Sequence, residues 1–141
     1  RFYGALVNDG VACTPHFLIS KPQTGETPQY DTEQIVENTA AIEPMISMLE
    51  TVVEEGTGTG AAIDGYRVAG KTGTAEYVDE DTGVYAKNSY NLGFVGVLPN
   101  ASTPLVCFVG VNEVPYERDT TEVFKDIMTE AISRYRVVQS D

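Results

Sequence analysis

The sequence predicts an α/β chain of the α+β type, in which helices cover an antiparallel sheet of about three main strands. Leu92–Leu98 and Leu105–Val111 are rich in β-branched and aromatic residues. Only the Pro99–Pro104 turn separates them, and so short a connection makes the two strands antiparallel neighbours. The following segment, Asp119–Arg136, has apolar residues at helical spacing, so it forms an amphipathic helix that can cover the sheet.

Composition limits the classes of function. The chain has 141 residues, of which 42% are hydrophobic, enough for the core of one domain. Its 21 acidic and 9 basic residues give a net charge of −12, which repels a phosphate backbone and makes nucleic acid a poor candidate partner. No apolar run approaches the roughly 20 residues of a membrane helix, and no signal-peptide pattern is present. Cys13 and Cys107 lie among apolar residues without partners at metal-ligand spacing, which predicts buried free thiols and no metal site.

The N-terminal third of the chain is expected to be only partly regular. Arg1–Val7 is apolar and aromatic and has no capping residue before it, which predicts a partial helix cut from a longer domain. That helix is expected to stop at Asn8-Asp9-Gly10. Val11–Ile19 is expected to be extended, with Pro15 restricting it to an edge or irregular strand. Lys21–Asn38 is polar and is expected to be rich in turns.

The middle of the chain is expected to contain a helix and the first main strand. Apolar residues recur at helical spacing from Ile42 to Val53, and Gly56 is placed to end the helix, which predicts a helix over Ile42–Glu55. A loop of small residues is expected over Thr57–Gly65, followed by an extended run over Tyr66–Thr74. Tyr77–Tyr90 is polar and long for a simple hairpin, so it is expected to be a loop. Asp119, with an acidic residue three positions later, resembles a capping box at the start of the C-terminal helix.

The clearest candidate for a functional motif is the run Lys71-Thr72-Gly73-Thr74. A lysine on an extended strand, beside hydroxyl groups and small residues, makes a cationic edge that a substrate can approach closely. Such an edge suits a carboxylate. For Lys71 alone, a solvated surface charge at the end of a strand is the commoner interpretation. Further landmarks along the chain, given below, favour a substrate-binding strand formed by Lys71, Thr72, Gly73 and Thr74.

A competing interpretation comes from the spacing of Gly65, Gly70, Lys71 and Thr72, which satisfies the phosphate-binding G-x-x-x-x-G-K-T pattern. A true nucleotide-binding loop needs a strand before the first glycine and a helix that begins at the lysine. Neither is expected, because a loop of small residues precedes Gly65 and Gly73 disfavours a helix at Lys71. A nucleotide binder acting through Gly65–Thr72 therefore remains a remote alternative.

Several segments together resemble the transpeptidase domain of penicillin-binding proteins. Gly65–Glu76, the preceding Met48–Gly58 segment, and Gly93–Gly96 with Pro99 are similar to consecutive landmarks of that family, in family order. Tyr3–Leu18 is similar to the segment that precedes them, so the resemblance covers nearly the whole chain. The Thr-Ala-Glu ending of the motif and the strand around Gly93–Gly96 look more like the monofunctional class B enzymes than the bifunctional class A enzymes.

The resemblance implies that residues 1–141 are the C-terminal portion of a domain with the penicillin-binding/serine β-lactamase-like fold. The parent would be a membrane-anchored D,D-transpeptidase on the extracytoplasmic face of the bacterial membrane. It would cross-link peptidoglycan stem peptides, react with β-lactams and need no cofactor. Lys71 would supply positive potential beside the nucleophile, and the Thr72 and Thr74 hydroxyls would bind the terminal carboxylate of the substrate. Gly73 would permit close approach, and the backbone N–H of Thr74 would form part of the oxyanion hole.

Two of the three motifs of that family are not found in this chain. No serine is followed three positions later by lysine, so the nucleophile motif S-x-x-K is absent. Ser89-Tyr90-Asn91 has S-x-N spacing but follows the Lys71 motif, whereas the family motif precedes it. We therefore expect a truncated chain that is inactive alone. The alternative is a non-catalytic penicillin-binding module, such as a β-lactam sensor.

Truncation has a further expected consequence for partners. Without the rest of the transpeptidase domain, the helix over Ile42–Glu55 and one face of the sheet would be left open. We expect the chain to cover that surface by self-association or by binding the rest of the domain.

Three other groups of residues are weaker candidates. His16 has no visible serine or cysteine partner, so no catalytic role is assigned to it. An acidic cluster lacks the glycine and the terminal glutamate of a calcium-binding loop and is expected to be solvated. It consists of Glu76, Asp79, Glu80 and Asp81. Tyrosines that are candidates for the border of the groove are Tyr77, Tyr85 and Tyr90.

Overall fold

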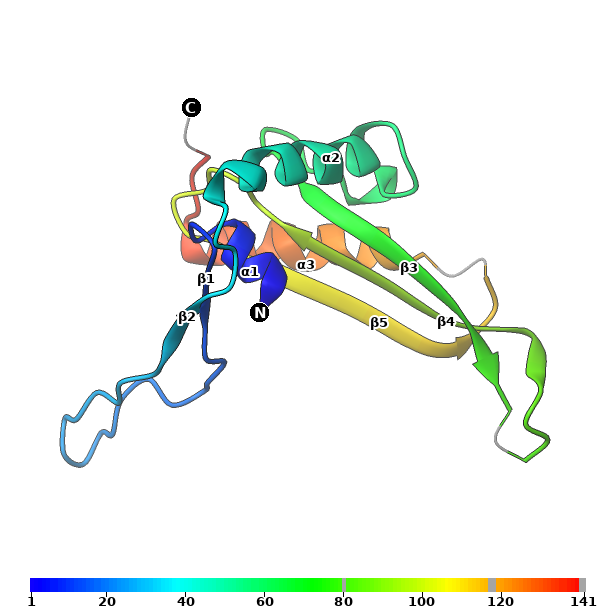
Figure 1. Cartoon of the computed structure of the whole chain (residues 1–141), viewed down its shortest axis with the longest axis horizontal. Coiled ribbons are helices and arrows are strands. Elements are labelled where there is room, and N and C mark those ends of the chain that lie inside the picture. Colours follow the sequence, from blue (N-terminus) through cyan, green and yellow to red (C-terminus); the bar gives the residue numbers. More distant parts are fainter. Residues whose placement is uncertain (80, 117–118, 140–141) are drawn as a thin grey trace.

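The main sheet has three antiparallel strands in the order β3-β4-β5. The structure is a computed structural model that describes residues 1–79, 81–116 and 119–139. Strand β3 is Ala69–Val78, β4 is Tyr85–Val97 and β5 is Val106–Val114, and helices lie on both sides of the sheet (Figure 1). Both pairings are antiparallel, so the predicted α+β class with a three-stranded antiparallel sheet is confirmed.

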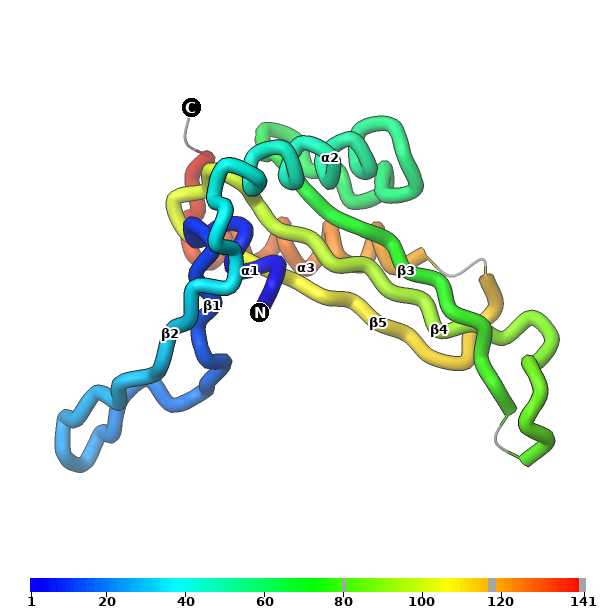
Figure 2. The backbone as a smooth tube through the Cα atoms, viewed as in Figure 1, coloured from blue at the N-terminus to red at the C-terminus, as the bar shows by residue number. Residues whose placement is uncertain are grey.

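The first hairpin of the sheet is longer than predicted. Strand β3 begins at Ala69 instead of Tyr66 and continues to Val78, which pairs with Tyr85. The prediction of a loop over Tyr77–Tyr90 is therefore wrong for most of that segment, because tyrosine and valine favour extended backbone. In the turn, the Asp79 carboxylate accepts hydrogen bonds from the N–H groups of Asp81 (3.1 Å) and Thr82 (2.8 Å). The tube in Figure 2 shows this hairpin extending past the end of β5.

Helix α3, Thr120–Tyr135, covers one face of the sheet, as predicted. Its N-cap is Asp119, whose Oδ1 accepts a hydrogen bond of 2.7 Å from the N–H of Thr121. Its C-cap is Arg136, which adopts a left-handed conformation with φ 52°. Phe124 and Met128 are buried beneath the central strand β4, where they form one core with Phe94, Leu98 and Val109.

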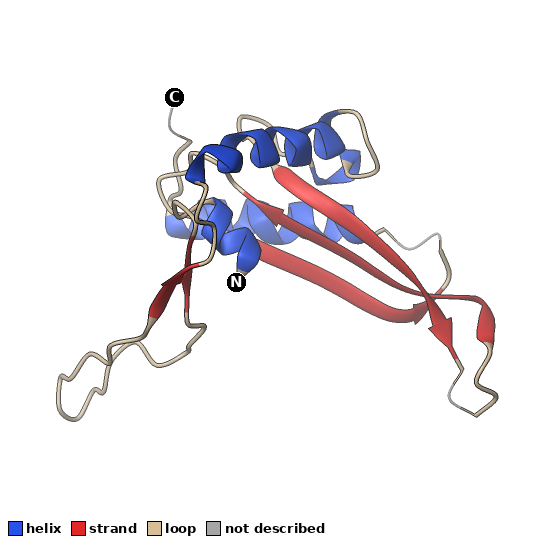
Figure 3. Ribbon diagram, in the orientation of Figure 1, coloured by secondary structure: helices blue, strands red, loops and turns tan. Residues whose placement is uncertain are grey.

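Helix α2, Ile42–Glu54, packs against the other face at the start of β3 (Figure 3). Ile46 and Leu49 lie with Ala69 and Val97, which point away from Phe94 because side chains alternate along a strand. Leu6 of α1, Phe2–Leu6, completes this second cluster. One side of α2 is therefore covered within the chain itself, whereas Met48 on the same helix is 59% exposed. The part of this face formed by β5 remains open, since Phe108 of β5 is 71% exposed.

A two-stranded sheet of β1, Val11–Cys13, and β2, Thr32–Gln34, projects away from the main sheet (Figure 1). The strand predicted over Val11–Ile19 is thus shorter, and β2 lies inside a segment predicted to be rich in turns. Cys13 is exposed, contrary to the expectation of a buried thiol. Successive side chains of a strand lie on opposite faces, and the neighbouring Ala12 occupies the buried face of β1. Cys107 is half-buried, and this burial raises the pKa of its thiol. Two short 3₁₀ turns, η1 at Thr39–Ala41 and η2 at Thr59–Ala61, flank α2.

Candidate active site

The Lys71–Thr74 motif lies on the outer strand of the sheet. Within the described residues β3 pairs only with β4, so the opposite edge of β3 has no strand partner. Ala69 and Gly70 are buried, and the strand then emerges so that Lys71, Gly73 and Thr74 are exposed and Thr72 is half-buried. The fold therefore anchors the start of the motif in the core and presents its remainder at an open edge.

Strand alternation divides the motif between the two faces of β3. Thr72 and Thr74 are register partners of Phe94 and Leu92, so their side chains lie on the face covered by α3. Lys71 points to the opposite face. Its Nζ donates a hydrogen bond of 2.9 Å to the carbonyl oxygen of Thr72, which holds the ammonium group against the motif.

Phe94 determines where the motif strand lies. A Cβ at Gly70 would overlap the Phe94 ring, and a Cβ at Gly58 would lie 3.3 Å from Cε2 of the same ring. Both glycines therefore allow backbone to pack directly against Phe94. At Gly73, by contrast, the nearest atom to an added Cβ would be the Gly93 carbonyl oxygen at 3.9 Å. The motif is thus tightly packed at Gly70 and open at Gly73.

A cavity of about 280 Å³ lies beside the threonines of the motif. Thr72, Gly73 and Thr74 line it, whereas Lys71 lies on the other side of the strand. The remaining lining residues come from the loop after α2, from β4 and from the start of α3. They are Thr57, Leu92, Gly93, Tyr116, Asp119, Thr120 and Thr121.

Two polar groups of the cavity were not predicted as site residues. The hydroxyl of Thr57 lies 2.6 Å from the hydroxyl of Thr72, a hydrogen bond in which either can donate. Asp119 was predicted only as a helix cap. Its Oδ1 accepts hydrogen bonds from the Thr121 hydroxyl (2.6 Å) and N–H (2.7 Å), which hold the pKa of Asp119 below its ordinary value. Thr57 lies within the Met48–Gly58 segment that resembles the family, but its contact with Thr72 and the position of Asp119 at the cavity are produced by the tertiary fold.

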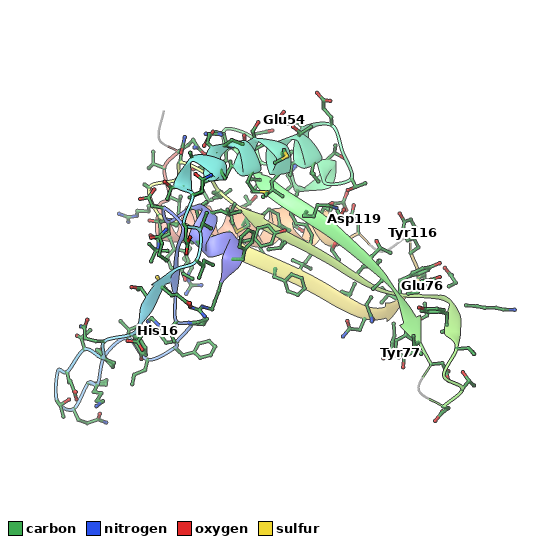
Figure 4. All side chains as sticks on the ribbon, viewed as in Figure 1. His16, Glu54, Glu76, Tyr77, Tyr116 and Asp119 are labelled. Atoms are coloured by element: carbon green, nitrogen blue, oxygen red, sulfur yellow. The ribbon has the colours of Figure 1, made fainter. Side chains whose placement is uncertain are left out.

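The tyrosines lie differently from the prediction. Tyr116 lines the cavity and meets Tyr90 edge to face, with ring centroids 5.7 Å apart. Figure 4 places Tyr116 and Asp119 near the end of the sheet from which the hairpin extends, with Tyr77 farther out on the hairpin. Tyr77, Tyr85 and Tyr90 do not themselves line this cavity.

The weaker candidates lie outside the site. His16 belongs to the arm that carries β1 and β2, far from the motif in Figure 4, and stacks on Tyr30 with ring centroids 3.6 Å apart. In Ser89-Tyr90-Asn91, which has only the spacing of the S-x-N motif, Asn91 Oδ1 accepts a hydrogen bond of 3.2 Å from the Glu113 N–H within the sheet. The described residues contain no group of three or more potential metal ligands, and Glu80 of the acidic cluster lies outside them.

The geometry contradicts the nucleotide-binding interpretation. Gly65 lies in a turn with φ 81°, and Lys71 lies inside β3 instead of at the start of a helix. The N-terminal amides of a helix that would cradle phosphates are therefore lacking at Lys71.

A lysine-threonine-glycine motif on the edge strand of an antiparallel sheet, beside a cavity, is typical of serine acyltransferases that react with penicillins. The sequence model of the penicillin-binding protein transpeptidase domain matches residues 1–129. The chain belongs to this family.

Relatives and solved structures agree with this assignment. The chain is 36% identical to stage V sporulation protein D of Bacillus subtilis over 115 residues, which cover 77% of the chain and 17% of that protein. It is 32% identical to the probable peptidoglycan D,D-transpeptidase PenA of Neisseria meningitidis over 114 residues, 80% of the chain and 18% of that protein. The chain thus spans about a sixth of the length of these relatives.

Two crystal structures have the same fold over nearly the whole chain. One is a putative peptidoglycan glycosyltransferase from Atopobium parvulum, with a TM-score of 0.80 and 34% identity, covering 96% of this chain and 32% of that chain. The other is penicillin-binding protein 3 from Mycobacterium tuberculosis complexed with aztreonam, with a TM-score of 0.80 and 26% identity. That match covers 99% of this chain and 35% of the other. None of the helices within the described residues is long and apolar enough to cross a bilayer.

Proposed function

We propose that this chain supplies one wall of the active site of a peptidoglycan D,D-transpeptidase, of the class B type that its motif resembles. The observation that carries the proposal is the position of the Lys71–Thr74 motif on a strand edge that has no partner strand among the described residues, with its threonines lining a cavity. PenA, a relative, is named as a probable peptidoglycan D,D-transpeptidase, and a structure with the same fold was solved with aztreonam, a β-lactam.

The proposed reaction is serine acyl transfer. A serine outside this chain attacks the carbonyl carbon of the penultimate D-alanine of a stem peptide, the serine proton is transferred to the leaving amine, and terminal D-alanine departs. The amine of a second stem peptide then attacks the acyl-enzyme, which forms the cross-link and restores the serine hydroxyl. In a β-lactam the same attack opens the ring, and the acyl group remains on the serine.

Each residue of the motif has a role that its position permits. Lys71 provides positive potential next to the nucleophile, and the Thr72 and Thr74 hydroxyls donate hydrogen bonds to the terminal carboxylate of the substrate. Gly73 leaves space for the substrate to approach, and the backbone N–H of Thr74 donates to the oxyanion. None of these roles requires a metal or a cofactor.

The rest of the transpeptidase domain is the proposed partner of the open sheet face. Phe108 and Val106 are 71% and 47% exposed on the face opposite α3, and β5 has no strand partner on its outer edge within the described residues. Apolar side chains beside an unpaired edge favour association with another segment. When the chain is isolated, self-association would cover the same surface.

The parent protein is proposed to be membrane-anchored, with this domain on the extracytoplasmic side.

Labelling with a fluorescent penicillin tests this proposal. A protein that joins this chain to a serine-bearing segment of the domain is expected to be labelled stoichiometrically, and hydroxylamine should release the label from its ester. The isolated chain should stay unlabelled, because none of its serines has a lysine three positions later. An unlabelled joined protein would contradict the proposed function. A labelled protein that never turns over stem peptides would instead favour a β-lactam sensor.

A further inference from the structure

We propose that Thr57 is a positioning residue of the carboxylate site, because it fixes the hydroxyl of Thr72 so that the Thr72 proton points toward the substrate. The inference rests on the proposed function, which assigns Thr72 to the substrate carboxylate. Its basis is the 2.6 Å hydrogen bond between the two hydroxyls, which joins the loop after α2 to the motif strand at the cavity.

The backbone around Thr57 is held in place by two packed glycines. An added Cβ at Gly56 would lie 2.9 Å from the Val52 carbonyl oxygen, and one at Gly58 would lie 3.0 Å from the same atom. The Gly58 N–H also donates a hydrogen bond of 2.9 Å to that oxygen, at the end of α2. The threonine between these glycines is therefore presented at a defined position, even though its side chain is exposed.

The same aromatic ring locates both partners of the hydrogen bond. Gly58 packs on Phe94, and Phe94 is the register partner of Thr72 in the neighbouring strand. The loop and the strand thus share one fixed support. A single hydrogen bond contributes little net free energy, so it would not by itself hold two mobile threonines together. The packing of both backbone segments on Phe94 is what places the two hydroxyls in contact.

Counting protons decides the direction of the hydrogen bond in the substrate complex. A threonine hydroxyl has one proton to donate and two lone pairs to accept with. If Thr72 donated to Thr57, it would have no proton left for a carboxylate. If Thr57 donates to Thr72, the Thr72 proton is free for the carboxylate, and the chain of two hydrogen bonds is polarised in one direction. Within the described residues, Thr72 is the hydrogen-bond partner of the Thr57 hydroxyl.

The test compares substrates with and without a carboxylate in the protein that joins this chain to the serine-bearing segment. The measurement is the second-order rate constant of acylation by benzylpenicillin and by its methyl ester. Thr57→Val should slow acylation by benzylpenicillin about five-fold, the effect of one lost hydrogen bond, and leave the ester within about two-fold. Thr57→Ser, which keeps the hydroxyl, should restore the rate. Thr59→Val, two residues away and outside the cavity, is the matched control.

A double-mutant cycle separates positioning from direct contact. If Thr57 acts through Thr72, Thr57→Val should have no further effect in a Thr72→Val background. Independent effects of the two substitutions would overturn the positioning role, as would an equal loss for benzylpenicillin and the ester. If Thr72→Val itself leaves the preference for the carboxylate unchanged, the proposed role of Thr72 fails, and this outcome is distinct from failure of Thr57 alone.

Discussion

Phe94 of β4 and Phe124 of α3 meet edge to face, with ring centroids 4.9 Å apart and ring planes at 70°. Both rings are fully buried. Phe94 also packs on Gly58 and Gly70, so one aromatic pair joins the covering helix, the central strand and the motif strand. The position of the candidate site therefore depends on the packing of this pair.

Gly70→Ala is expected to destabilise the domain. An added Cβ would overlap the Phe94 ring and lie 2.8 Å from the Val95 carbonyl oxygen. Overpacking of this kind costs about 1–3 kcal/mol. Urea denaturation of the protein that contains the whole domain measures the loss, with Gly73→Ala as control because its added Cβ meets no atom closer than 3.9 Å. Equal stability of the two variants would contradict the role of Phe94 as a fixed support.

Arg67 connects the start of β3 to α2 through two glutamates of different burial. Its guanidinium donates to Glu50 at 2.6 and 3.0 Å and to Glu43 at 3.1 Å, and the hydrogen bond with Glu50 raises the pKa of Arg67 above its ordinary value. The Glu50 side chain is 14% exposed and that of Glu43 is 69% exposed. Glu50→Gln should therefore cost about 1–3 kcal/mol of unfolding free energy, and Glu43→Gln less than about 0.5 kcal/mol.

Chemical denaturation of the same protein distinguishes the two glutamates. Arg67→Lys should resemble Glu50→Gln, because lysine cannot form the two-pronged hydrogen bond. Arg134→Lys, near the exposed end of α3, serves as the control. If Glu43→Gln proves the more damaging substitution, burial does not decide the strength of this ion pair.

Asp119→Ala is expected to remove the N-cap of α3 and cost about 1 kcal/mol at neutral pH. The hydroxyl and N–H of Thr121 stabilise the carboxylate and lower the pKa of Asp119 below its ordinary value. A lowered pKa in the folded state means that this contribution is complete above the unfolded-state pKa near 4 and is lost as the pH falls through the folded-state pKa. The difference between Asp119→Ala and the unaltered protein should therefore shrink below about pH 4.

Unfolding curves at pH 7 and near pH 3 measure this change. Asp126→Ala, an exposed position within α3, is the control and should show no loss at either pH. If the difference in unfolding free energy between Asp119→Ala and the unaltered protein is the same at both pH values, the cap does not depend on the charge of Asp119.

Elements with a strong periodic pattern were predicted closely from the sequence. The apolar residues of α2 and α3 recur at helical spacing, and the short turn between β4 and β5 allows only antiparallel pairing. Strand β2 was missed because Thr32-Glu33-Gln34 is entirely polar and exposed, so no alternation marks it. Its pairing with β1 is a tertiary effect that no local pattern encodes.

The candidate site was predicted only in part for the same reason. The motif itself has a recognisable sequence, and the structure brings Thr72, Gly73 and Thr74 together at a cavity. Two other lining residues come from distant segments: Thr57 follows the end of α2, and Tyr116 follows the end of β5. Their proximity follows from strand register and from the packing of Phe94, which local sequence patterns do not specify.

The central claim is that the Lys71–Thr74 strand forms a wall of a serine acyltransferase site. The most direct measurement is the second-order rate constant of acylation by a fluorescent penicillin in the protein that joins this chain to the serine-bearing segment. Lys71→Ala should lower that rate about 100-fold, because electrostatic stabilisation of this kind contributes factors of about 10²–10³. Lys125→Ala, an exposed lysine on α3, should leave it unchanged. If correctly folded Lys71→Ala reacts within about two-fold of the unaltered protein, this strand is not part of the reacting site.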